Sequence, residues 1–88
     1  MEFEWDPVKE ASNIRDHDGI DFATAQLVFE DPNRIERYKP ERGEERFWVL
    51  GGAGAVLLVV IYVERNSKIR IISARKATKR EKAFYRNR

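Results

Sequence analysis

The sequence predicts an α+β fold in which two N-terminal helices pack on a four-stranded antiparallel sheet and a third helix ends the chain. Three observations carry this prediction. Apolar residues of the second helical segment recur with a helical period, the period changes to two after residue 33, and Thr78 with Glu81 forms a capping-box pattern. The 88 residues fit one domain, residues 1–88.

The first helix is expected from Pro7 to about His17. Asp6 is a typical N-cap, and proline is favoured at the first helical position because its missing N–H costs nothing there. Lys9, Asn13 and His17 follow one another at intervals of four, so they are expected on one side of the helix.

A second helix is expected from Phe22 to about Glu30, with Asp21 as its N-cap and Asp31-Pro32 as its end. The two helices would form a hairpin around Gly19, which suits a left-handed helix cap.

Four strands account for the middle of the chain. The segment Val56–Val63 is continuously apolar and rich in β-branched residues, as expected of a central strand covered on both faces. Gly51, Gly52 and Gly54 are interpreted as the connection before it. The expected strands are residues 34–38, 46–50, 56–63 and 68–75.

The composition excludes several kinds of site. There is no Cys and one His, so disulfides, Cys-based zinc sites, thiol catalysis and His-cluster metal sites are not expected, and neither metal nor cofactor is predicted. The apolar run Ala53–Val63 is too short to span a bilayer, and the first residues lack the pattern of a signal peptide. A cytoplasmic protein that does not bind membranes is expected.

Charge is distributed very unevenly behind the net value of +2. Residues 1–33 carry −7, residues 34–64 carry 0 and residues 65–88 carry +9. Such a basic block is either a solvated face or a surface for nucleic acid.

The most informative stretch runs from Ile69 to Arg80, because its cations fall on the last strand and on the start of the C-terminal helix. Free N–H groups there attract anions, and arginine matches the geometry of phosphate oxygens. Arg75, at the strand end, is the leading candidate for a phosphate site. Arg70 and Arg80 are more simply explained as side chains that face solvent or form ion pairs with the acidic residues of the first third of the chain. The candidate substrate-binding cations are Lys9, Arg70, Lys76 and Lys79.

His17 and Glu64 are the candidates for proton transfer. His17 is the one imidazole, and its ordinary pKa suits proton transfer near neutrality, although it would equally serve as a structural helix end. Glu64 follows the core strand and is more simply a surface ion pair with Arg65. Trp5 and Tyr85 are retained as aromatics that would stack on unpaired bases, the alternative being core packing.

No nucleophile triad, phosphate-binding glycine loop or paired-carboxylate motif is evident. Arginines, an imidazole and carboxylates suit attack of a ribose 2′-hydroxyl on the neighbouring phosphate, because cations stabilise the charge of that transition state. RNA cleavage is therefore a candidate activity.

Several short motifs follow one another along nearly the whole chain: Phe3-x-Trp5-Asp6-x-x-Lys9, Asn13 with His17, Phe22, Val28-Phe29-x-Asp31-Pro32, Gly43-Glu44-x-Arg46, Glu64-Arg65, Ile69 to Arg75, and Ala77-Thr78 with Glu81 and Tyr85. In this order and spacing they resemble the BrnT toxins, and the run ending Ile71-Ile72-Ser73-Ala74-Arg75 is the most specific piece.

The resemblance implies a RelE-like ribonuclease of a type II toxin–antitoxin pair. It implies RNA cleavage that arrests translation, a ribbon-helix-helix BrnA-like antitoxin that neutralises the toxin, and DNA contact only through that antitoxin, with a possible dimer inside a heterotetramer. Carried over by position, Arg75, Arg46 and His17 would be catalytic.

Two positions depart from the family pattern. Members commonly have Lys-His-Gly where this chain has Asp16-His17-Asp18-Gly19, and they commonly carry arginine where this chain has Val56. Losing two cations near a phosphate weakens transition-state binding. The alternatives are therefore a weakened member that only binds its antitoxin and represses their operon, or a plain RNA-binding module.

Overall fold

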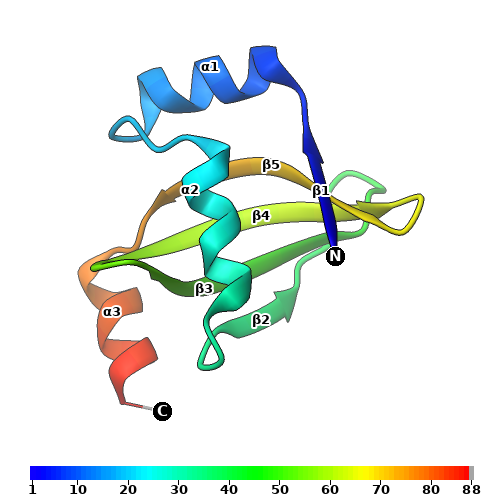
Figure 1. Cartoon of the computed structure of the whole chain (residues 1–88). Coiled ribbons are helices and arrows are strands. Elements are labelled where there is room, and N and C mark those ends of the chain that lie inside the picture. The colour runs from blue at the N-terminus through cyan, green and yellow to red at the C-terminus, as the bar shows by residue number, and fades with distance from the viewer. Residues whose placement is uncertain (88) are drawn as a thin grey trace.

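The strand β4 (Val56–Arg65) lies at the centre of a five-stranded sheet with the order β1-β5-β4-β3-β2 (Figure 1). The structure is a computed structural model that describes residues 1–87. The other strands are β1 (Glu2–Trp5), β2 (Ile35–Tyr38), β3 (Arg46–Ala53) and β5 (Lys68–Lys76). The helices are α1 (Pro7–Asp16), α2 (Phe22–Gln26), the 3-10 helix η1 (Leu27–Glu30) and α3 (Lys79–Arg86).

The expected four-stranded antiparallel sheet is wrong, because the sheet has a fifth strand and is mixed. β1 pairs with β5 in parallel, Phe3 lying opposite Ile69 and Trp5 opposite Ile71. The rings of Phe3 and Trp5 pack edge-on against Phe29 and Phe22, and this burial holds the short strand to the sheet.

The expected pair of full N-terminal helices is also wrong. α1 begins at Pro7 with the Asp6 carboxylate accepting from Val8 N, as expected. The second helix contains only five α-helical residues, after which η1 continues it as a tighter turn. Phe22, Ala25, Val28 and Phe29 are buried along this element, so it covers the sheet despite its irregularity.

Gly51 and Gly52 belong to β3 and are not the connection that the sequence suggested. A Cβ on Gly51 would come within 2.9 Å of Val28 Cγ1. Glycine is therefore needed in the strand because η1 approaches its backbone closely. The turn itself lies at Gly54, whose φ is +66°.

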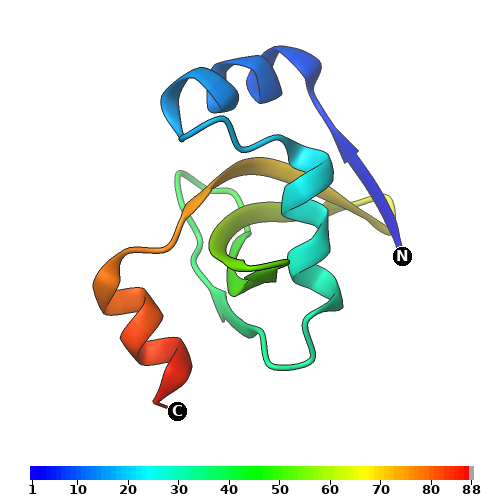
Figure 2. The same ribbon diagram turned by 60° about the vertical axis from the view of Figure 1, so that its left-hand side comes forward.

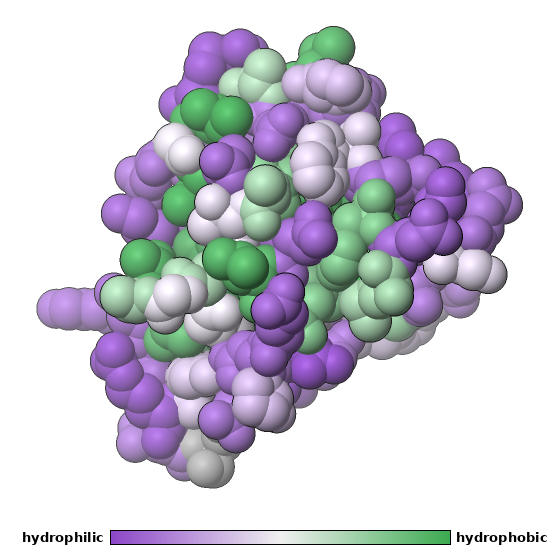
Figure 3. All heavy atoms as spheres, in the orientation of Figure 1, coloured by the Kyte–Doolittle hydropathy of each residue, from purple (hydrophilic) through white to green (hydrophobic). Residues whose placement is uncertain are grey.

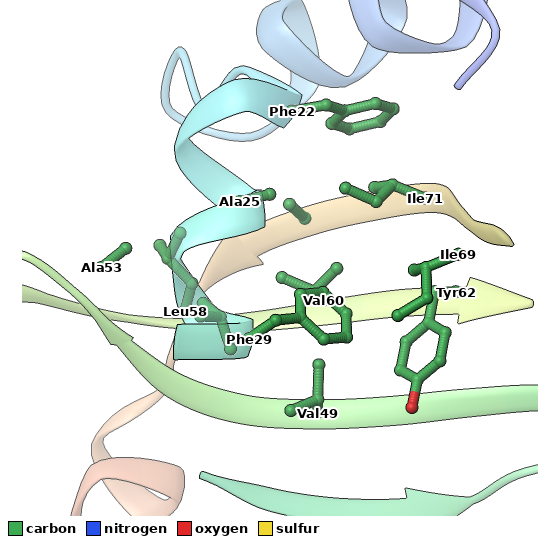
Figure 4. Packing of buried hydrophobic residues seen from close by; sticks show 12 residues of the cluster. Phe22, Ala25, Phe29, Val49, Ala53, Leu58, Val60, Tyr62, Ile69 and Ile71 are labelled. Carbon is green, nitrogen blue, oxygen red and sulfur yellow. The ribbon is translucent and has the colours of Figure 1, made fainter. Parts of the chain in front are cut away.

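Most of the core lies between α2, η1 and one face of the sheet. Figure 4 shows Phe22, Ala25 and Phe29 gathered in one cluster with the strand residues Val49, Val60 and Ile71. On the outside of this layer, hydrophobic residues interrupt the hydrophilic surface over the helices and adjoining strands (Figure 3). None of the helices within residues 1–87 combines the length and apolar character needed to cross a bilayer.

The opposite face of the sheet is covered only in part. Leu50, Val59 and Ala77 form a smaller buried cluster there, with Trp48 and Tyr85 packed against it. α3 begins after β5 with the expected capping box between Thr78 and Glu81. Figures 1 and 2 show α3 at the end of the sheet, well apart from α1 and α2.

A single buried amide joins α1 to β5 beyond the end of β1. Asn13 Nδ2 donates to Ala74 O at 2.8 Å, and Asn13 Oδ1 accepts from Ala74 N at 3.0 Å. The same Nδ2 donates to Ile20 O at 3.1 Å. The Asn13 side chain thus supplies the hydrogen bonds that a neighbouring strand would give to β5.

Asn13→Ala should destabilise the protein strongly. It leaves the N–H and C=O of Ala74 and the C=O of Ile20 without these partners, at a cost of about 3 kcal/mol in the free energy of unfolding. Ser12→Ala, at the adjacent half-buried position, should change it by less than about 0.5 kcal/mol. Urea denaturation of the two variants checks this, and equal midpoints would contradict the role of the amide.

Candidate functional site

A cleft of about 950 Å³ lies on the face of the sheet opposite α2. Its floor consists of sheet side chains that include Trp48, Ile61 and Ser73. α3 forms one wall with Arg80, Glu81 and Phe84, and the loop after β2 contributes Lys39 and Glu41. The expected basic strand end and the C-terminal helix therefore border the same hollow.

Strand register brings the floor residues into one row. Arg37 lies opposite Trp48, Trp48 opposite Ile61, and Ile61 opposite Ser73. Residues that lie opposite one another in a sheet point to the same face. The row therefore crosses from β2 to β5 on the cleft side.

Arg75 and Arg46 both line this cleft, on either side of the row. Arg75 lies opposite Val59, which pairs with Leu50 on β3, whereas Arg46 pairs with Val63 at the other end of the same strands. Two residues that are 29 positions apart in the sequence are thus brought to one site.

Positive charge dominates the lining. Among residues 1–87, five cations line the cleft, Arg37, Lys39, Arg46, Arg75 and Arg80, against the two carboxylates of Glu41 and Glu81. Such a surface attracts anions, and forked guanidinium groups are well matched to phosphate oxygens.

Glu81 is the partner of Arg75. Arg75 Nη1 and Nη2 donate to the two carboxylate oxygens of Glu81 at 2.8 and 2.9 Å. These hydrogen bonds lower the pKa of Glu81 to about 2, helped by the Thr78 amide, and they raise the pKa of Arg75. The carboxylate therefore stays ionised while it holds the arginine.

Arg46 is held by two carboxylates from the loop between β2 and β3. Arg46 Nε donates to Glu44 at 2.7 Å, and its Nη1 donates to Glu41 at 3.0 Å. The hydrogen bond from Arg46 is the main cause of the lowered pKa of Glu44. Both arginines are thus oriented by acids that a bound anion would have to displace or share.

Two further contacts position α3 as a wall. The guanidinium of Arg37 lies 5.1 Å from the centre of the Phe84 ring, a cation–π contact. The Tyr85 hydroxyl donates to Asp31, which also accepts from Gly52 N at 2.8 Å. Tyr85 therefore anchors the helix and does not line the cleft.

His17 and Lys9 lie outside the cleft, in a separate hollow of about 260 Å³ between α1 and β5. Ser73 lines both hollows. The structure thus places the imidazole beside the arginine site and not in it.

Glu64 lies on the other side of the sheet. It borders a hollow together with Phe29, Phe47 and Tyr62, on the face that α2 covers. It is not brought together with Arg75 or Arg46.

The remaining predicted substrate-binding residues are dispersed. Arg70 pairs with Glu4 at 3.4 Å, and Lys76 borders a small hollow beside Val56 and Lys82. Lys79 is exposed at the start of α3 and does not line the cleft. Trp5 packs on Phe22 as part of the core.

Sequence reasoning missed Arg37, Arg80, Glu81, Trp48 and Phe84 as cleft residues. Arg37 carried a weak signal, since it lies on a strand with period-two alternation. The other four depend on strand register and on where α3 docks, which short-range patterns do not reveal. Within the described residues 1–87, no three His, Cys, Asp or Glu side chains gather as metal ligands.

The comparison with known families agrees with the motifs. The model of the family described as "Ribonuclease toxin, BrnT, of type II toxin-antitoxin system" matches residues 5–81. No curated protein gives a significant match. The matched region includes β5, its Arg75 and the start of α3 up to Glu81. The chain belongs to the BrnT family of ribonuclease toxins of type II toxin–antitoxin systems.

Proposed function

We propose that this protein is an endoribonuclease toxin that cleaves RNA in the cleft between Arg46 and Arg75 and thereby inhibits translation. The observation that carries the proposal is the meeting of these two arginines in one cationic cleft, with a row of sheet side chains between them. The backbone of a single-stranded RNA supplies phosphate groups, which the guanidinium groups of two arginines are well suited to bind.

The reaction proposed is transesterification within RNA. The 2′-oxygen attacks the adjacent phosphorus while the bond from phosphorus to the 5′-oxygen breaks, which leaves a 2′,3′-cyclic phosphate and a 5′-hydroxyl. A base takes the 2′-hydroxyl proton, and an acid protonates the departing 5′-oxygen. Negative charge accumulates on the phosphoryl oxygens, where Arg75 and Arg46 stabilise it without a metal ion.

Proton transfer is assigned to His17 in this proposal. RNA that extends from the cleft past Ser73 reaches the hollow that His17 borders. Glu64, the other candidate, faces away from the arginines, and Glu81 is a poor base because Arg75 holds its pKa at about 2. Arg75 and Arg46 therefore supply the electrostatic part of catalysis and His17 the proton transfer.

The proposed partners are RNA and a ribbon-helix-helix antitoxin of the BrnA type in the cytoplasm. The excess of cations around the cleft suits an acidic or occluding partner that keeps RNA out. DNA contact is assigned to the antitoxin, in a complex that holds a toxin dimer inside a heterotetramer.

A second candidate function has specific support. Both arginines are already paired with carboxylates in the free protein, and Asp16 and Val56 stand where the family commonly has cations. These features favour a weakened toxin that binds its antitoxin and acts in operon repression, or a module that binds RNA without cutting it.

Arg75→Ala and Arg46→Ala should each lower the rate of RNA cleavage about a hundredfold or more, because each removes a cation that stabilises the transition state. Arg86→Ala, on α3 but outside the cleft, should keep the activity of the unchanged protein. Gel analysis of RNA incubated with purified, antitoxin-free protein in EDTA measures this, with cell-free translation as a second readout.

Three outcomes separate the candidates. Cleavage in EDTA that depends on Arg75 and Arg46 supports the proposed ribonuclease. Tight antitoxin binding without cleavage supports the weakened toxin. Salt-sensitive RNA binding with neither cleavage nor an antitoxin supports the binding module.

Glu81→Gln should reveal the Arg75–Glu81 pair through pH. Because the folded pKa of Glu81 is about 2 and its usual value is 4.5, the pair stabilises the fold fully above about pH 4.5 and progressively less toward pH 2. Glutamine keeps the acceptor for Thr78 N, so the variant removes the charge and preserves the helix cap.

The contribution is about 1 kcal/mol or less, because the pair is partly exposed to solvent. We expect the unchanged protein to melt up to about 4–8 °C above Glu81→Gln at pH 6, with the gap closing in acid. Thermal unfolding at several pH values measures the gap. A gap that is constant with pH would contradict the ion pair.

A further inference from the structure

We infer that the hollow between α1 and β5 is a nucleoside subsite that continues the cleft, so that the two hollows form one track for single-stranded RNA. The inference rests on the proposed function, because it assumes that RNA phosphate occupies the arginine cleft. It assigns to the second hollow the ribose and base of the nucleotide that adjoins this phosphate.

The two hollows meet at Ser73. The row of floor residues that starts at Arg37 on β2 ends at Ser73 on β5, and Ser73 borders the second hollow as well. Beyond Ser73 stand Ser12 and His17 of α1. A chain that crosses the strands along this row therefore passes directly from one hollow to the other.

A β-bulge in β5 contributes to the junction. Tyr62 of β4 lies opposite Ile71 and its neighbour Ile61 lies opposite Ser73, so Ile72 is an extra residue in β5. Ile72 borders the second hollow. The Asn13 amide holds α1 to β5 at Ala74, two residues further along, which fixes the opposite wall.

The lining suits a nucleoside better than a phosphate. Lys9 and Asp16 carry opposite charges, so their formal charges cancel, in contrast to the cationic excess of the cleft. Hydroxyl groups of Ser12 and Ser73 offer hydrogen bonds to sugar and base, and the Ile72 side chain offers a surface for the base, which leaves the His17 ring available for proton transfer at the ribose. Lys9 is exposed and can meet the phosphate that follows.

Filling the hollow is the direct test. Ser12→Phe places a ring in it without changing any charge. Ala11→Phe adds the same ring at the neighbouring position, which is exposed and does not line the hollow. The probe is a five-nucleotide 2′-O-methyl RNA, which cannot undergo attack by a 2′-hydroxyl. The affinity of the probe is measured by fluorescence anisotropy. The rise in melting temperature that inorganic phosphate causes in each variant shows whether the cleft still binds phosphate.

We expect Ser12→Phe to bind the probe about tenfold more weakly than the unchanged protein, whereas Ala11→Phe binds it equally well. Both should keep the stabilisation by phosphate. A second pair of variants keeps the test valid if Ser12→Phe fails to fold. Lys9→Ala should weaken binding of the probe and lower its salt dependence by about one ion, and Arg15→Ala on the same helix but outside the hollow should do neither.

Two results overturn the inference in different ways. If Ser12→Phe and Lys9→Ala bind the probe as the unchanged protein does while Arg75→Ala does not, RNA uses the cleft alone, and only the subsite is refuted. If the unchanged protein binds no probe and cleaves no RNA, the proposed function fails together with the subsite.

Discussion

The β-bulge at Ile72 determines which side of the sheet carries Arg75. Ile69 and Ile71 point into the core beneath α2, and strict alternation from them would send Arg75 to the same side. The extra residue shifts the alternation, so that Ala74 is buried and Arg75 lies in the cleft. Arg70, before the bulge, points to the cleft side as well, since its partner Val63 is four residues from Val59, the partner of Arg75. Assembly of the cleft depends on this local irregularity, because Arg46, Trp48 and Ile61 face the cleft through ordinary pairing and Arg75 joins them only through the bulge.

Much of the fold was predictable where local chemistry determines structure. Asp6-Pro7 and the Thr78–Glu81 capping box locate the starts of α1 and α3, and the apolar run from Val56 locates the central strand. β1 was missed because its four residues gain stability only by pairing with a strand more than sixty positions away. Gly51 and Gly52 were predicted to form a connection for a related reason. The contact that requires glycine at Gly51 comes from η1, and the neighbouring sequence does not reveal it.

The site was predictable in part. Local signals, a strand end before a capped helix and a family motif, made Arg75 and Arg46 candidates, and the fold places both in one cleft. Glu64 was chosen for its position next to the core strand, but alternation from the buried Tyr62 turns it to the other face. Arg37 and Arg80 enter the cleft through strand register and helix docking, which are long-range properties. Glu81 was known as a helix cap, and its bond to Arg75 depends on how α3 folds back.

The Asn13 amide has a consequence for association between chains. An unpaired strand edge offers N–H and C=O groups to any passing strand and so promotes aggregation. β1 is too short to cover all of β5, and at Ala74 a side chain from α1 occupies both backbone groups instead. The Asn13 amide thereby protects the backbone next to Arg75 from pairing with a strand of another molecule.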